Sequence, residues 1–110
     1  MYFGKDFWMI PYYDKTGVDV RGKLKEMGFK IGRLYNDILC MVNPPAGWKA
    51  EQADREKPVI VPQAYPSTSV EWTDGYILFD QEGNPRIQAT HYHSDEEDLE
   101  DEDTGWLVFV

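Results

Sequence analysis

Short apolar segments in the first half of the chain predict β-strands. Residues 2–13 are aromatic and apolar, with Pro11 among them, and predict a short strand or an edge segment. Residues 29–43 predict two strands around Asn36-Asp37, a dipeptide that tolerates the positive φ values of a hairpin turn. Because residues 38–42 are nearly all apolar, we expect them to form a central strand.

The second half of the chain continues this pattern. The segments "PVIVP" and "YILFD" predict strands, "QEGN" a turn, and Pro85 begins a returning strand. Alternation places Ile87, Ala89, His91 and His93 on one face of that strand. Residues 51–57 are polar and predict a helical turn or a loop, and residues 63–75 predict a long connection. The final apolar run, residues 106–110, predicts a buried strand, with Leu107 and Phe109 on one face.

Helical spacing occurs in residues 18–29. Val20, Leu24 and Met27 recur at i, i+4 and i+7 and form one apolar stripe, and Gly28 is placed to end the helix in a left-handed conformation. The predicted fold class is therefore α+β: an antiparallel sheet of four to six strands with one main helix packed on one face.

Charge is concentrated in one segment of the chain. The 110 residues predict a single domain, residues 1–110, with a net charge of −9. Eight of the 20 acids fall within residues 95–103. The other 12 acids are nearly balanced by 11 Lys and Arg, which leaves the rest of the chain with a net charge of −1. The eight are Asp95, Glu96, Glu97, Asp98, Glu100, Asp101, Glu102 and Asp103. We expect them in an acidic loop at residues 94–105 between two strands. Such a field repels nucleic acid and anionic membranes and attracts a basic protein surface.

Two segments carry a resemblance. "PPAGWKAE" (residues 44–51) and "WTDGYILFDQEGNPRIQATHY" (residues 72–92) resemble a group of small prophage and bacterial proteins of uncharacterised function. The group shares an LP-x-GW element, a later Trp, and D-x-x-G-x-x-R leading into an aromatic strand. This chain departs from the group in its return strand, which reads "ATHYHSDEED" where the group tends to have Phe-Tyr-Lys and Tyr-Asp-Arg runs. The resemblance implies a phage-associated origin and no known chemistry.

Compartment is predicted from what the sequence lacks. No apolar run approaches the ~20 residues of a membrane span, and the N-terminus lacks the basic start and long apolar stretch of a signal peptide. The single cysteine, Cys40, lies in the apolar run "ILCMV", which predicts a core residue. With the resemblance, these features predict a protein of the cytoplasm of a bacterial host.

Metal binding is the main catalytic alternative. His91 and His93 point the same way on a strand, and Asp95 or Glu97 could add oxygen ligands for zinc or manganese and a hydrolytic water. The competing interpretation is two partly exposed histidines that face solvent or the acids, which raise the pKa of imidazole and favour ion pairs. We favour this interpretation, with no metal or cofactor, because no His or Cys elsewhere completes a site.

Exposed aromatic residues are a second candidate for partner binding. Tyr12, Tyr13, Tyr65 and Trp72 lie beside proline or in expected loops, where aromatic side chains serve as interface anchors. The first functional hypothesis is a small phage-associated acidic protein-binding module, in one version an inhibitor that occupies the basic groove of a host nucleic-acid-binding or defence protein. The alternatives are a metal-dependent enzyme using His91 and His93, and a structural or assembly protein without catalytic activity. The sequence leaves the oligomeric state open.

Overall fold

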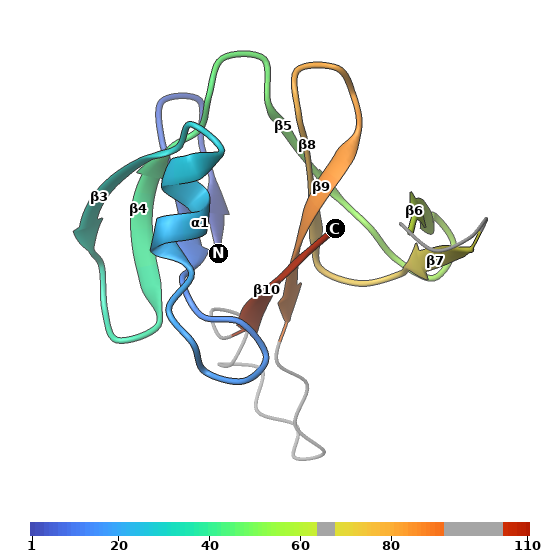
Figure 1. The fold of residues 1–110 in the computed structure, drawn as a ribbon, viewed down its shortest axis with the longest axis horizontal. Coiled ribbons are helices and arrows are strands. Elements are labelled where there is room, and N and C mark those ends of the chain that lie inside the picture. Colours follow the sequence, from blue (N-terminus) through green and yellow to red (C-terminus); the bar gives the residue numbers. More distant parts are fainter. Residues whose placement is uncertain (64–67, 92–104) are drawn as a thin grey trace.

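The computed structural model describes residues 1–63, 68–91 and 105–110, which form three antiparallel sheets (Figure 1). The first sheet has the order β1-β2-β4-β3. Its strands are β1 (Tyr2–Phe3), β2 (Trp8–Pro11), β3 (Lys30–Leu34) and β4 (Leu39–Asn43). The hairpin predicted at Asn36-Asp37 is confirmed: Asn36 Oδ1 accepts hydrogen bonds from the backbone N–H groups of Ile38 and Leu39, each at 2.8 Å. The central position of β4 is confirmed as well.

The predicted fold class is wrong, because the helix is too short to be a main structural layer. Helix α1 (Arg21–Glu26) has six residues, and the described part of the chain has no helix of seven or more. Val20 and Met27, which belong to the predicted apolar stripe, are its two cap residues. Gly28 ends it with φ of 98°, as predicted. The protein is mostly β.

The second sheet has the order β10-β9-β8-β5. Its strands are β5 (Lys49–Gln52), β8 (Tyr76–Phe79), β9 (Pro85–His91) and β10 (Gly105–Phe109). Strands β8, β9 and β10 were predicted. Strand β5 was not: its last two residues, 51 and 52, belong to residues 51–57, for which a helical turn or loop was expected. Only Ala50 of this edge strand packs against the core, so β5 has no apolar alternation to reveal it.

The third sheet is a two-stranded ribbon of β6 (Val59–Pro62) and β7 (Ser69–Trp72). Strand β6 was predicted, and β7 lies within residues 63–75, where a long connection was expected. The ribbon lies beyond the second sheet, away from α1 (Figure 1). Its Val61 and Trp72 are buried with Ala53 and Ile77 in a small second core.

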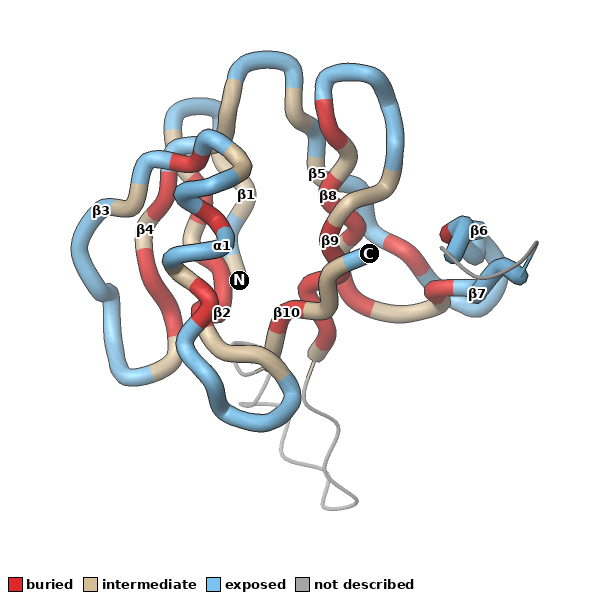
Figure 2. The backbone as a smooth tube through the Cα atoms, viewed as in Figure 1, coloured by how far each residue is buried: buried red, intermediate tan, exposed pale blue. Residues whose placement is uncertain are grey.

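The main core lies between the first sheet with α1 and the second sheet, as the buried segments of both sides show (Figure 2). Successive residues of β8 face the two cores: Leu78 is in the main core and Ile77 in the second. Strand β10 also faces both cores: Leu107 and Phe109 pack on the main core, and Val108 packs on the second core. A strand with both faces covered reads as a continuous apolar run, which accounts for the final apolar run of the sequence.

Strand β10 also joins the two large sheets. The backbone N–H of Leu107 donates to the carbonyl of Tyr13 at 2.8 Å, and Asp14 forms a parallel bridge with Leu107. The prediction of a strand at residues 106–110 is confirmed for Trp106 to Phe109, and the shared face of Leu107 and Phe109 is confirmed. Within the described residues, no helix is long and apolar enough to cross a membrane.

Candidate functional site

The acidic segment, residues 95–103, lies outside the described residues, as do His93 and Tyr65. The structure does describe the two strands that precede and follow it. His91, the last residue of β9, and Gly105, the first of β10, are register partners, and all five residues of β10 pair with β9. The two strands expected on either side of the loop at residues 94–105 are therefore present, and the single domain and the loop stay predictions.

His91 is the one predicted metal ligand that the structure describes. Its ring lies 6.0 Å from the ring of Tyr76, edge to face, and it lines an open pocket together with Asp54 and Asp74. Among the described residues, no group of three or more His, Cys, Asp or Glu side chains could hold a metal ion. The other candidate ligands, His93, Asp95 and Glu97, fall outside those residues, so the metal hypothesis stays a prediction.

The expected exposure of Tyr12 is wrong. Its side chain is 4% exposed because the chain beyond β2 continues along the main core. The Tyr12 hydroxyl donates to the carbonyl of Asp37 at 2.9 Å and accepts from the hydroxyl of Tyr13 at 3.0 Å. The hydrogen bond with Tyr13, followed by burial, raises the pKa of Tyr12 to about 12. The Arg21 guanidinium lies 4.9 Å from the centre of the Tyr12 ring. Tyr13 is half-buried.

The expected exposure of Trp72 is also wrong. It lies in β7 opposite Val59, and this cross-strand pair faces the second sheet. The Trp72 side chain is 6% exposed and packs in the second core. The predicted set of exposed aromatic anchors therefore loses Tyr12 and Trp72, and Tyr65 lies outside the described residues.

Cys40 is a core residue, as predicted. It is fully buried in β4, and burial raises the pKa of its thiol to about 11. A nucleophilic cysteine needs a stabilised thiolate, which this apolar site disfavours.

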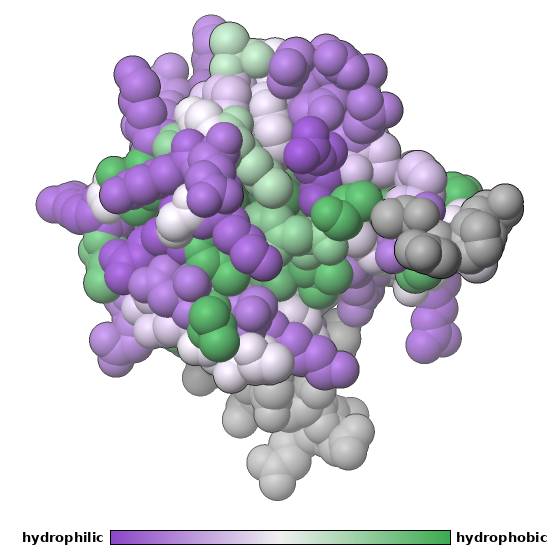
Figure 3. Space-filling view, in the orientation of Figure 1, coloured by the Kyte–Doolittle hydropathy of each residue, from purple (hydrophilic) through white to green (hydrophobic). Residues whose placement is uncertain are grey.

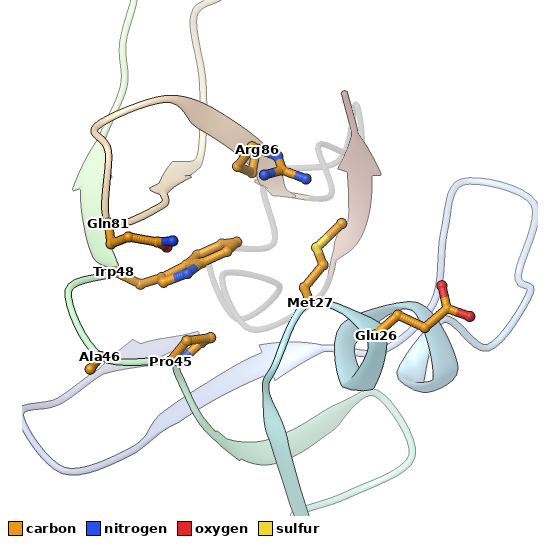
Figure 4. Close-up of a pocket in the computed structure, with 7 residues that line it drawn as sticks. All are labelled: Glu26, Met27, Pro45, Ala46, Trp48, Gln81 and Arg86. Atoms are coloured by element: carbon orange, nitrogen blue, oxygen red, sulfur yellow. The ribbon is translucent and has the colours of Figure 1, made fainter.

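An open pocket of about 460 Å³ lies between the two large sheets, and we call it the seam pocket. It is bounded by the end of α1, the connection from β4 to β5, the turn from β8 to β9, and the start of β9 (Figure 4). Its lining residues are Glu26, Met27, Pro45, Ala46, Trp48, Gln81 and Arg86.

Local sequence explains how the connection reaches the pocket. Two prolines, Pro44 and Pro45, end the pairing of β4 because they lack backbone N–H groups. The backbone N–H of Trp48 then donates to the carbonyl of Pro45 at 3.2 Å, which closes a turn. Gly47 has φ of 88°, and a Cβ there would lie 2.9 Å from the Cβ of Gln81. Glycine thus lets the connection approach the turn between β8 and β9.

Arg86 is the cation of the seam pocket, and Asp80 holds it in place. Arg86 Nη1 donates to Asp80 Oδ2 at 3.3 Å. Asp80 Oδ1 accepts from the backbone N–H groups of Glu82 at 2.9 Å and Asn84 at 3.0 Å. The hydrogen bond from the Asn84 N–H does most to hold the pKa of Asp80 below its usual range. The hydrogen bond from the Glu82 N–H and the charge of Arg86 lower it further. Asp80 is therefore a fixed anion that positions the guanidinium.

Met27, Pro45 and Trp48 are the large apolar residues that line the seam pocket, and two of them also pack on neighbouring apolar residues. The ring of Trp48 packs edge-to-face on that of Phe29, with centroids 4.9 Å apart. Met27 and Phe109 are half-buried against the main core, and Lys23 Nζ lies 5.2 Å from the centre of the Phe109 ring. Figure 3 shows apolar surface between α1 and the second sheet in this region.

Sequence reasoning missed the seam pocket. In the sequence, Trp48 ends the Pro-Pro-Ala-Gly-Trp element. Alternation along residues 86–91 placed Arg86 on the strand face opposite Ile87 and Ala89. A tryptophan directly after a turn-forming Gly was the available signal. Nothing in the sequence placed it beside Arg86, because Trp48 lies in the connection before β5 and Arg86 lies in β9, far along the chain.

Comparison with protein families, curated proteins and solved structures finds no match to this chain. The resemblance of residues 44–51 and 72–92 to small prophage proteins gains no support from it.

Proposed function

We propose that the protein is a protein-binding module whose acidic segment, residues 95–103, associates with a basic protein surface. The carrying observation is the distribution of charge: the segment holds −8 of the net −9, and the rest of the chain is near neutral. A field focused in one segment speeds the encounter with a surface of opposite charge.

The position of the segment between two paired strands supports the proposal. His91 and Gly105 face each other in the antiparallel register of β9 and β10, so the residues on either side of positions 92–104 are neighbours in the sheet. These two strands pack on the main core through Ala89 and Leu107. A segment that joins two packed strands loses less conformational entropy on binding than a free tail.

The finer version of the proposal concerns the partner. Carboxylates attract the same Lys and Arg clusters that bind phosphates. The partner proposed is therefore a protein with a basic, nucleic-acid-binding groove, which the acidic segment occupies and blocks. In the same proposal, the protein acts as an inhibitor and performs no catalysis.

Neutralising part of the segment tests the proposal. The test variant carries Gln at Glu96, Glu97, Glu100 and Glu102. The matched control carries Gln at four exposed acids elsewhere, Glu51, Glu56, Glu71 and Glu82. Both variants lose the same charge and differ only in its place. Each is used to capture proteins from a bacterial lysate, and the captured protein is then produced pure for rate measurements.

We expect the test variant to associate with the purified partner about tenfold more slowly, because electrostatic steering acts on the association rate. The control variant should associate almost as fast as the original. The partner's nucleic acid should compete with the original protein. Equal rates for the two variants, or binding insensitive to salt, would show that the acidic segment does not recognise the partner.

A further inference from the structure

The seam pocket combines groups that suit one kind of ligand. Arg86, Trp48 and Met27 point from three sides into the same open space, with Pro45 beneath (Figure 4). Guanidinium groups pair with carboxylates through parallel N–H···O bonds, and an indole ring packs against apolar and aromatic groups. We propose that the seam pocket binds a carboxylate carried by an apolar or aromatic group.

Arg86 retains hydrogen-bonding capacity for such a ligand. A guanidinium has five N–H donors, and the bond to Asp80 uses one of them. The Arg86 side chain is 43% exposed, whereas Asp80 is 7% exposed and already accepts two backbone hydrogen bonds. Asp80 therefore orients the guanidinium and leaves its outer edge open. A cation held in place before binding loses little conformational freedom when a ligand arrives.

The other charges around the pocket are compatible with a bound anion. Glu26 is the one acid among the lining residues, and Figure 4 shows its carboxylate turned away from the space that Arg86 and Trp48 face. Lys23 lies in α1, four residues before the C-cap residue Met27. Its ammonium lies 5.2 Å from the centre of the Phe109 ring and is not among the groups that line the pocket, so Arg86 is the cation that a ligand would meet.

Pocket size limits the ligand to a small group. The volume of about 460 Å³ falls within the range of roughly 300–1,000 Å³ for ligand sites. A phenyl or indolyl acid fits such a space with its ring on Trp48 and its carboxylate on Arg86. The same chemistry comes from two sources: a free small acid, and the C-terminal residue of a polypeptide.

Nuclear magnetic resonance titration of the isotope-labelled full chain tests the proposal. The probes are N-acetyl-phenylalanine and its neutral amide, at physiological ionic strength. We expect the indole N–H signal of Trp48 to shift saturably with the acid and not with the amide. The indole N–H of Trp8, which is 4% exposed in the main core, serves as the internal reference. This comparison needs no variant, so it does not depend on whether a substitution folds.

A substitution then tests the role of the guanidinium. Arg86→Lys keeps the charge but loses the paired donors, and we expect it to weaken binding about tenfold, or about 1.4 kcal/mol. Arg33→Lys, at an exposed position of β3, is the matched control and should bind as the original does. Thermal unfolding of both variants confirms that they are folded.

The outcomes distinguish a free small acid from a polypeptide C-terminus as the ligand, and they show which results would overturn the proposal. A peptide ending in Phe that binds more tightly than N-acetyl-phenylalanine identifies a polypeptide C-terminus as the ligand, and equal or weaker binding identifies a free small acid. Equal shifts with acid and amide would overturn the proposal. The absence of a saturable shift, or unchanged binding by a folded Arg86→Lys variant, would overturn it too. None of these results depends on the acidic segment.

Discussion

Two buried side chains, Cys40 and Asp80, respond to burial in opposite ways. The Cys40 thiol is enclosed by the main core, and burial raises its pKa because a thiolate loses its hydration there. Asp80 is nearly as enclosed, yet backbone N–H groups and Arg86 stabilise its charged form and lower its pKa. Hydrogen bonding to the charged form thus outweighs loss of hydration at Asp80.

Cys40 makes the stability of the protein sensitive to alkali. The folded state raises the thiol pKa from 9.0 to about 11, so unfolded chains release the proton first as the pH rises. We expect the free energy of unfolding to fall between pH 9 and pH 11. Urea unfolding at several pH values measures this slope.

A Cys40→Ala variant is the comparison for this slope. It should show a weaker dependence on pH over the same interval, although the lost volume lowers its stability at every pH. Tyr12, whose pKa is also raised, acts in the same direction at higher pH, so a Tyr12→Phe variant separates the two groups. Identical slopes for the original protein and Cys40→Ala would contradict the prediction.

Sequence reasoning at this scale succeeded for Cys40 and failed for Tyr12 and Trp72. The apolar neighbours of Cys40 lie on the same strand, so its burial follows from local sequence. Tyr12 and Trp72 are covered by side chains from other elements of the fold. Adjacent prolines and loop-like composition carry no information about such contacts.

At the scale of the elements, the strands that the sequence reveals most clearly bury two or more apolar side chains. Strands β4 and β8 were predicted because their side chains fill the cores. Edge strand β5 buries no side chain fully, and ribbon strand β7 buries one. Both strands are therefore defined by their backbone pairing and not by a pattern of apolar side chains. The predicted helix was too long because an apolar stripe does not distinguish helical residues from caps.

Gly105 is needed where β10 begins. A Cβ at this position would collide with the carbonyl oxygen of Thr90 in β9. We expect Gly105→Ala to lower the free energy of unfolding by about 1–3 kcal/mol, the range typical of overpacking. Thermal or urea unfolding measures the loss.

Gly22→Ala is the matched control for Gly105→Ala. A Cβ at Gly22 has open space in α1, and alanine favours helix, so this variant should gain about 0.5–1 kcal/mol. A Gly105→Ala variant as stable as the original would show that the start of β10 shifts to accept a side chain.

The whole molecule depends on one core that two sheets share. Trp8, Ile10 and Leu24 come from the first sheet and α1, and Ile87 and Leu107 come from the second sheet. Neither large sheet buries its inner face without the other. Sequence patterns identified most of these core residues, but the pairing of two separate sheets requires contacts that no local pattern encodes.

Leu107→Ala tests this dependence. The side chain is 1% exposed in the main core, and truncation should cost about 2–5 kcal/mol. We expect amide hydrogen exchange to quicken by the same factor in β4 and in β9, because the sheets unfold together. Val110→Ala, at a position 55% exposed, should change stability by less than about 0.5 kcal/mol. Faster exchange confined to β9 and β10 would indicate that the first sheet is stable alone.

The hydrogen bond from Leu107 to Tyr13 has a consequence for synthesis on the ribosome. The N-terminal segment emerges first, but its partner in β10 is translated after every other described strand. Until then, Ile10, Leu24 and Phe29 have no opposing sheet to cover them fully. Nascent chains arrested before Gly105 should therefore remain sensitive to protease and accessible to chaperones, and the protein acquires its resistance only after β10 has left the exit tunnel.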